Sequence, residues 1–117
     1  LKGQLIKLRQ AYLELAGNLK LLERLMVQSL TGLMPTLRNI LRLKGNERIA
    51  IKKAEVISQL KEGYGVNVAP LSKVLQSKLK TSKLLKNEIE PVFEQYLNTI
   101  QCLSIAVDEL RLSKVLQ

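Results

Sequence analysis

Apolar residues recur at steps of three and four along most of this chain, which is the spacing of one face of an α-helix. The most regular stretch covers residues 19–43. Its apolar face is formed by Leu19, Leu22, Met26, Leu30, Leu33, Leu37 and Ile40. Asn18 is suited to cap the first turn of such a helix, and Gly45 is suited to follow its last turn. The pattern predicts one long, core-forming helix.

Pro35 lies inside this predicted helix. A proline in a helix interior lacks an amide donor and crowds the carbonyl four residues earlier, here that of Thr31, at a cost of about 3 kcal/mol. The apolar spacing nevertheless continues across Pro35, which falls on the polar side of the helix. We therefore expect a kinked but continuous helix, and a break at Thr31–Gly32 is the alternative.

An apolar stripe also predicts a first helix that ends near Ala16. The stripe consists of Leu1, Leu5, Leu8, Tyr12 and Leu15. Only the two-residue break at Gly17 and Asn18 separates this helix from the long one. We therefore expect the two helices to pack as an antiparallel hairpin.

Three more helices are predicted in the second half of the chain. The third follows Gly45 and Asn46 and ends near Glu62, with an apolar face of Ile49, Val56, Ile57 and Leu60. A loop with two glycines is predicted over residues 63–67. A short fourth helix begins near Pro70, whose ring suits a first helical turn. Its apolar face consists of Leu71, Val74, Leu75 and Leu79.

The last predicted helix is the longest, and Thr81 or Ser82 is suited to cap it. Its apolar stripe consists of Leu85, Ile89, Val92, Tyr96, Ile100, Leu103, Val107 and Leu110. Pro91 lies within the stripe, so a second kink or a short preceding turn is expected there. Its outer face carries Glu90, Glu94, Asp108 and Glu109.

Together these elements predict an all-α fold, an up-and-down helical bundle of about five helices, two of them long and proline-kinked. Residues 1–117 fit a single domain. No uninterrupted apolar run approaches about 18 residues, so we expect no membrane span and a cytoplasmic location. The helical pattern is already running at Leu1, and we therefore expect this domain to be a fragment of a longer chain.

The formal net charge of +9 is unevenly distributed. Residues 1–45 hold eight basic against two acidic residues, residues 46–80 hold seven against three, and residues 81–117 hold four against five. Four cations of the long helix fall in a strip about 40° wide and about 33 Å long on an ideal helix. This basic stripe consists of Lys20, Arg24, Arg38 and Arg42.

The basic stripe predicts contact with an anionic partner, such as a nucleotide, a nucleic acid or an acidic protein surface. An ordinary solvated helix face is the alternative explanation. Tyr64 is the one aromatic residue that we expect to be exposed enough to stack on a base. Tyr12 and Tyr96 fall on apolar faces and are expected in the core.

Catalytic constellations are not found in the sequence. The chain has no histidine, which excludes histidine-dependent acid–base and nucleophilic catalysis and most zinc sites. Glu88, Glu90 and Glu94 fit a solvated acidic face better than a set of metal ligands. Cys102 fits a small, half-buried side chain better than a nucleophile. We therefore predict no catalytic residue, metal or cofactor, and expect that the chain is not an enzyme by itself.

Two runs, Lys7–Gly45 and Pro91–Leu110, resemble the C-terminal helical region of bacterial predicted nucleotidyltransferases. The resemblance implies a preceding catalytic domain with a Gly-Ser motif and paired carboxylates, and an accessory bundle akin to the nucleotidyltransferase substrate-binding domains. Those domains are related in fold to HEPN domains, whose nuclease members use an Arg-x4–6-His motif. This chain lacks the histidine of that motif, so ribonuclease activity is not implied.

Two functional hypotheses follow from the sequence. The first is a non-catalytic accessory domain of a nucleotidyltransferase-like protein, which would contact substrate, form a homodimer or both. Its partners would be the missing N-terminal catalytic domain of the same chain and a nucleotide or nucleic acid, with Arg38 and Arg42 as the first candidates for phosphate contact. The alternative is a stand-alone basic module that binds nucleic acid through its phosphates. A purely structural homodimer is a third, weaker hypothesis.

Overall fold

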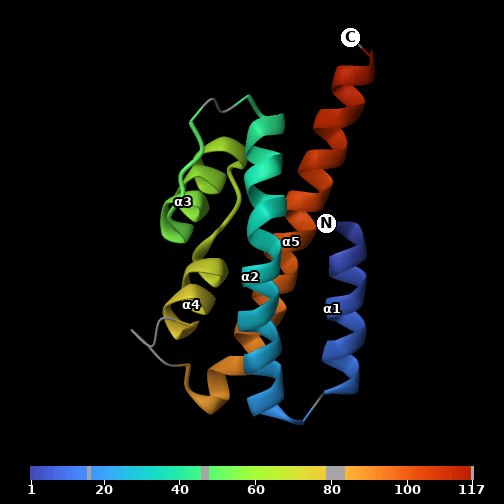
Figure 1. Ribbon diagram of the computed structural model, residues 1–117. Helices are drawn as coiled ribbons and strands as arrows, with labels where there is room; N and C mark the ends of the chain where they lie inside the picture. Colours follow the sequence, from blue (N-terminus) through green and yellow to red (C-terminus); the bar gives the residue numbers. More distant parts are fainter. Residues whose placement is uncertain (16, 46–47, 79–83, 117) are drawn as a thin grey trace.

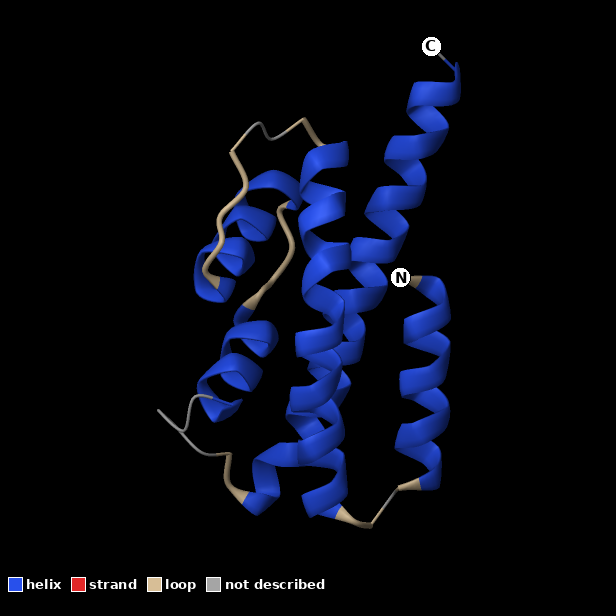
Figure 2. Cartoon of the chain, viewed as in Figure 1, coloured by secondary structure: helices blue, strands red, loops and turns tan. Residues whose placement is uncertain are grey.

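The computed structural model shows five α-helices among the residues that it describes, which are 1–15, 17–45, 48–78 and 84–116 (Figure 1). The helices are α1 (Lys2–Glu14), α2 (Leu19–Leu43), α3 (Lys53–Tyr64), α4 (Ala69–Lys78) and α5 (Lys86–Leu116). No strand occurs within these four ranges (Figure 2). The predicted all-α helical bundle is confirmed.

The long helices α2 and α5 form the centre of the bundle. α3 and α4 cover one side of α2, and α1 lies on the other side of the central pair (Figure 1). α2 is in contact with α3, α4 and α5, so it needs a broad apolar surface. Its buried residues are Leu22, Met26, Leu30, Leu33, Met34, Leu37, Ile40 and Leu41. The apolar face predicted for this helix is therefore buried, apart from Leu19, which is half-buried.

The main partner of α1 is α5, which corrects the prediction that α1 packs on α2 as a hairpin. Polar contacts tie the two helices together, since Arg9 Nη2 donates to Gln101 Oε1 at 2.6 Å. At the start of α1, Lys2 Nζ lies 2.7 Å from Asp108 Oδ2. The short connection brings α1 beside the bundle, but the side chains of α5 supply its complementary surface.

α2 is a single uninterrupted helix, so the alternative break at Thr31–Gly32 is wrong. Pro35 is exposed on its surface, as the apolar spacing predicted. The helix also begins as expected, because the Asn18 side chain accepts a hydrogen bond from the amide of Leu21 at 3.2 Å. Beyond its end, Gly45 adopts a φ of +98°, a conformation that glycine tolerates well. The kinks expected at Pro35 and Pro91 remain predictions.

α3 begins later and ends later than the apolar pattern indicated. Ile49 precedes the helix, in a segment that the Gln59 side chain holds in place. The Gln59 amide donates to the Arg48 carbonyl at 2.9 Å and accepts from the Ala50 amide at 3.0 Å. The helix extends into the predicted loop only as far as Tyr64, and Gly65, in a left-handed conformation (φ +67°), ends it. Long-range side-chain bonds and one glycine therefore set these boundaries.

The apolar stripe of α5 is confirmed from Ile89 to Val107, where every predicted core residue is buried. Leu110 is half-buried, whereas Leu85 precedes the helix and is 62% exposed, contrary to the prediction. Four other predicted positions lie outside the described residues: Ala16, Asn46 and the cap candidates Thr81 and Ser82. So does Leu79, which was predicted for the apolar face of α4.

The five described helices lack the features of a membrane span. None of them combines the length and the apolar character needed to cross a bilayer.

Candidate functional site

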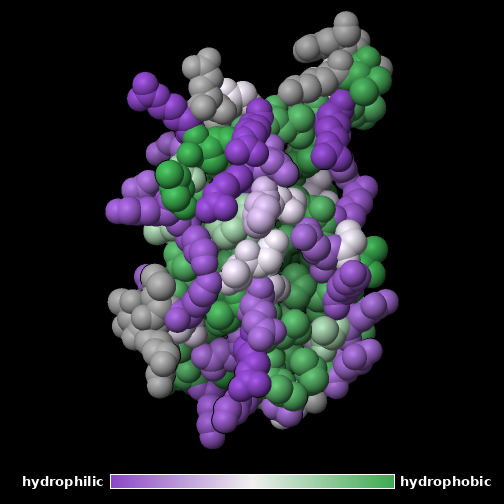
Figure 3. Space-filling model, viewed as in Figure 1, coloured by the Kyte–Doolittle hydropathy of each residue, from purple (hydrophilic) through white to green (hydrophobic). Residues whose placement is uncertain are grey.

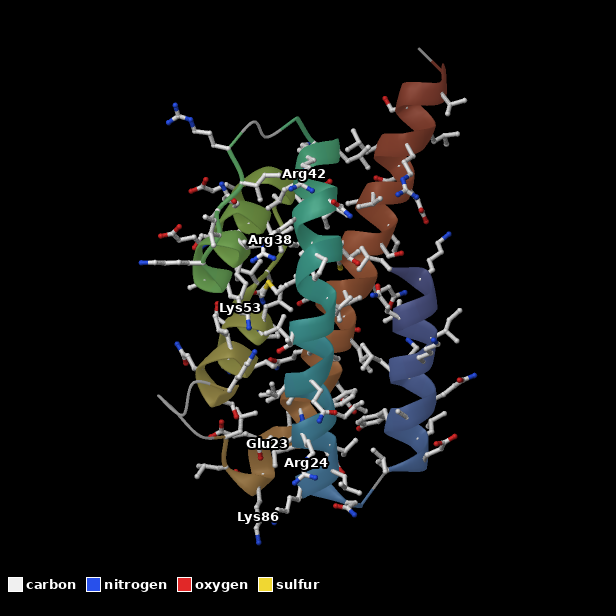
Figure 4. All side chains as sticks on the ribbon, in the orientation of Figure 1. Glu23, Arg24, Arg38, Arg42, Lys53 and Lys86 are labelled. Atoms are coloured by element: carbon white, nitrogen blue, oxygen red, sulfur yellow. The ribbon has the colours of Figure 1, made fainter. Side chains whose placement is uncertain are left out.

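Hydrophilic side chains run over the face where α2 meets α3 and α4, with apolar residues between them (Figure 3). The basic stripe of α2 lies on this side of the molecule, and Figure 4 labels three of its members, Arg24, Arg38 and Arg42. Lys20, Arg24 and Arg42 are exposed, and Arg38 is half-buried. The stripe is divided into two pairs, because about 21 Å of helix separates Arg24 from Arg38 at 1.5 Å per residue.

The pair near the end of α2 is engaged in contacts within the chain. Arg38 Nη2 donates to the carbonyl of Ile51 at 2.9 Å, which attaches the segment before α3 to α2. Arg42 Nη1 donates to Asn39 Oδ1 at 2.8 Å within its own helix. Arg38 and Arg42, the first candidates for phosphate contact, therefore already use donors to stabilise the fold. The structural role is clearer for Arg38, which is half-buried, than for Arg42, which is exposed.

The pair near the start of α2 lines an open hollow of about 430 Å³ between α2 and α4. The hollow is lined by Lys20, Glu23, Arg24, Val27, Gln28, Ser77 and Lys78. Its one carboxylate, Glu23, accepts a hydrogen bond from the Ser77 hydroxyl at 3.0 Å. Lys20 and Arg24 form no ion pair with any described residue, so their charges remain available to an anion from solution.

Two lysines that sequence reasoning missed meet beside this hollow. Lys53 is the first residue of α3 and Lys78 is the last residue of α4, and both are half-buried. Figure 4 shows Lys53 between α2 and the two short helices. Lys78 Nζ donates to Thr31 Oγ1 of α2 at 2.6 Å. Thr31, Lys53 and Lys78 come from three different helices, so no spacing pattern in the sequence could have predicted that they lie together.

The neighbouring Lys53 lowers the pKa of Lys78. The direct interaction between the two side chains is the largest cause, followed by burial and by the positive charge of Lys53. Within the described parts of the chain, one ion pair is found, and it joins Lys2 to Asp108 on the α1 side of the bundle. The two lysines therefore face one another without a neutralising carboxylate among those residues.

The prediction that Tyr64 is exposed enough to stack on a base is wrong. It is the last residue of α3 and is half-buried. Its hydroxyl donates to the Ile40 carbonyl of α2, and the Lys44 ammonium lies 5.6 Å from the centre of its ring. Burial raises the pKa of Tyr64, and the charge of Arg111 opposes that change. Tyr64 therefore fastens α3 to α2.

The other candidate groups have mixed outcomes. Tyr96 is fully buried as expected, and Tyr12 is half-buried, with its ring 5.0 Å from that of Phe93. Cys102 is exposed, contrary to the prediction of a half-buried side chain. Glu90 and Glu94 are exposed, as expected of a solvated acidic face, whereas Glu88 is half-buried. Within the four described ranges, no group of three or more histidine, cysteine, aspartate or glutamate side chains could hold a metal ion.

Comparison of the chain with models of known protein families gives no match, and neither do comparisons with curated proteins and with solved structures.

Proposed function

We propose that this chain is a non-catalytic accessory helical domain that contacts the phosphate groups of a substrate handled by an adjoining nucleotidyltransferase-like domain. One observation carries the phosphate-contacting part of this proposal. On the side where α2 meets α4, Lys20 and Arg24 line an open hollow, and no described carboxylate forms an ion pair with either cation.

The charge distribution supports an anionic ligand. The net charge of +9 attracts polyanions over long distances, and its basic residues are concentrated in the first two-thirds of the chain. Lysine and arginine contacts with phosphates supply the sequence-independent part of nucleic-acid binding. The Glu23 carboxylate also lies in the hollow, but it accepts a hydrogen bond from Ser77. We therefore place the first phosphate contacts at Lys20 and Arg24.

The accessory role is supported by resemblance. The runs Lys7–Gly45 and Pro91–Leu110, which resemble the helical region of predicted nucleotidyltransferases, supply most of the central helices α2 and α5. In such proteins the catalytic domain precedes the helical region and carries out the chemistry. In this proposal the bundle holds the substrate, and the catalytic domain earlier in the same chain acts on it.

Charge reversal at the hollow tests phosphate contact. Lys20→Glu combined with Arg24→Glu should weaken the binding of a fluorescent single-stranded oligonucleotide by about tenfold or more at low salt. The slope of log affinity against log salt should become shallower by about 1 to 2, because two phosphate contacts are lost. Fluorescence anisotropy across a salt series measures both quantities.

Lys61→Glu combined with Lys73→Glu is the matched control, because these exposed lysines do not line the hollow and the change in net charge is the same. The control should retain most of the affinity. Equal losses in the two double variants would show that only net charge matters. Failure of the wild-type chain to bind the oligonucleotide at low salt would overturn contact with the phosphates of a nucleic acid.

The reading frame upstream of the Leu1 codon tests the accessory role separately. It should encode a small α/β domain with a Gly-Ser motif followed by paired carboxylates. A reading frame that lacks this pattern would overturn the nucleotidyltransferase association, whatever the binding assay shows.

A further inference from the structure

We propose that Thr31, Lys53 and Lys78 form a site for one phosphate group at the point where α2, α3 and α4 meet. The inference rests on the proposed function and specifies one phosphate position within it. Its members come from three helices, so the site exists only in the folded bundle. It lies beside the Lys20–Arg24 hollow, which Lys78 also lines.

The Thr31 hydroxyl fixes the position of one ammonium group. Thr31 Oγ1 donates to the Val27 carbonyl at 3.3 Å and accepts a hydrogen bond from Lys78 Nζ at 2.6 Å. A lysine ammonium has three donors, and this contact uses one of them. The remaining donors can therefore reach an oxygen atom of a ligand without the side chain having to be ordered first.

Lys53 places a second positive charge against the first. Two neighbouring ammonium groups repel one another, and that repulsion accounts for part of the lowered pKa of Lys78. An anion bound between them replaces the repulsion by two attractions. The pair is therefore more favourable with an anion present than without one, as expected of an anion-binding site.

The start of α3 adds to the positive potential. Lys53 is the first residue of that 12-residue helix, and the preceding Lys52 provides no side-chain cap. Uncapped amides at a helix N-terminus favour a nearby negative charge. Glu55 in the first turn partly offsets this potential, but it is exposed. The helix end supports the site, while the lysine pair and the hydroxyl define it.

Phosphate is the ligand that best fits these groups. Lysines bind phosphate as point charges, and a phosphate dianion has enough oxygens to accept from both ammonium groups at once. The other charged groups next to Lys78 are Lys20, Glu23 and Arg24 of α2, which give an excess of positive charge around it. Because both lysines are only half-buried, a free phosphate, a nucleotide phosphate or a polynucleotide backbone can approach the site.

Titration of the wild-type chain with inorganic phosphate, followed by NMR of the lysine side chains, tests the site. Bound phosphate should raise the pKa of Lys78 towards its ordinary value, because an adjacent anion stabilises the charged form. Sodium chloride at the same ionic strength should change it much less. Equal effects of the two salts would overturn the proposal.

Two substitutions of Lys53 separate charge from structure. Lys53→Gln should raise the pKa of Lys78 in the free chain and weaken phosphate binding by about tenfold. Lys53→Arg keeps the charge and should keep most of the affinity, whereas Lys73→Gln, an exposed lysine of α4, should change neither quantity. Unchanged phosphate affinity in Lys53→Gln would overturn the site.

Nucleoside triphosphate and the single-stranded oligonucleotide, each tested on Lys53→Gln, distinguish the source of the phosphate. If Lys53→Gln weakens binding of the triphosphate alone, the site is assigned to a nucleotide. If it weakens binding of both ligands, the site is assigned to a phosphate group of the kind that both contain. If inorganic phosphate binds at Lys53 and Lys78 but the oligonucleotide never binds, the site stands and contact with nucleic acid fails. If Lys53→Gln weakens neither ligand while oligonucleotide binding still needs Lys20 and Arg24, the proposed function stands and the site is overturned.

Discussion

The hydroxyl oxygens of Ser29 and Tyr96 lie 2.7 Å apart, in a hydrogen bond between α2 and α5. Ser29 donates its own proton to the Met26 carbonyl at 2.8 Å, so Tyr96 is the donor between the two side chains. Tyr96 has no exposed surface, and burial raises its pKa well above the ordinary value, although the bond to Ser29 opposes this. The contact provides the partner that a buried hydroxyl requires.

Ser29→Ala should therefore destabilise the protein more than Tyr96→Phe. The serine substitution leaves a buried tyrosine hydroxyl without a partner, at a cost of about 1–3 kcal/mol, whereas Tyr96→Phe removes the donor itself and costs about 1 kcal/mol. Urea unfolding of both variants and of the double variant measures the two losses and their coupling. The reverse order would show that Ser29 is not the acceptor that satisfies Tyr96.

Individual residues were predictable from sequence where their role depends on the adjacent turn. Asn18 caps α2 as expected, because a cap bonds an amide only a few residues away. Cys102 and Tyr64 were misplaced because their exposure depends on which helix covers them. Lys53 and Lys78 were missed for the same reason, since only the packing of α3 and α4 on α2 brings them together.

At the scale of the elements, α2 runs without a break through two residues that disfavour helices. An interior glycine costs about 1 kcal/mol and an interior proline about 3 kcal/mol relative to alanine. Both Gly32 and Pro35 are exposed, so neither takes up a place in the core. The buried residues of α2 pack against three other helices, and most helical stability in proteins comes from such packing.

Gly32→Ala should raise the free energy of unfolding by about 0.5–1 kcal/mol, because alanine is the better helix former. A Cβ atom at this position would meet nothing within 4 Å, so no clash offsets the gain. Gly65→Ala is the matched control, and it should destabilise by about 1 kcal/mol because Gly65 has a φ of +67°. Chemical denaturation measures the free energy of unfolding of both variants. Destabilisation by Gly32→Ala would show that a side chain is not tolerated at position 32.

The partners of the helices were less predictable than their positions. A short connection places α1 next to α2 in the chain, yet α1 packs on α5, where Gln101 and Asp108 meet its polar side chains. An apolar stripe shows that a helix must be buried on that side, but it does not identify the helix that covers it. The stripe of α1 therefore fits either neighbour, and the polar contacts are made with α5.

At the scale of the whole molecule, a net charge of +9 is combined with little internal neutralisation. The one ion pair within the described ranges joins Lys2 to Asp108, and its side chains are 71% and 44% exposed, so it contributes little to stability. The basic residues around α2 and α4 therefore repel one another in the folded state. Self-repulsion of this kind destabilises a compact chain.

Added salt should consequently raise the unfolding midpoint of the wild-type chain at neutral pH, because screening weakens repulsion between exposed cations. The Lys61→Glu and Lys73→Glu double variant lowers the net charge from +9 to +5, since each substitution removes two charges. Its midpoint should depend less on salt. Thermal unfolding across a sodium chloride series measures both dependences, and a midpoint that falls with salt in the wild type would contradict net repulsion.

Helical periodicity in the sequence was enough to predict the all-α fold class, the approximate extents of the helices and the apolar faces of α2 and α5. Each of these depends on residues three or four positions apart, whose relation is set by helix geometry. The packed structure was needed to show that α1 packs on α5, that Arg38 binds the Ile51 carbonyl, and that Lys53 lies beside Lys78. Those relations join residues that are distant in the chain, so they arise when the helices pack and leave no periodic pattern in the sequence.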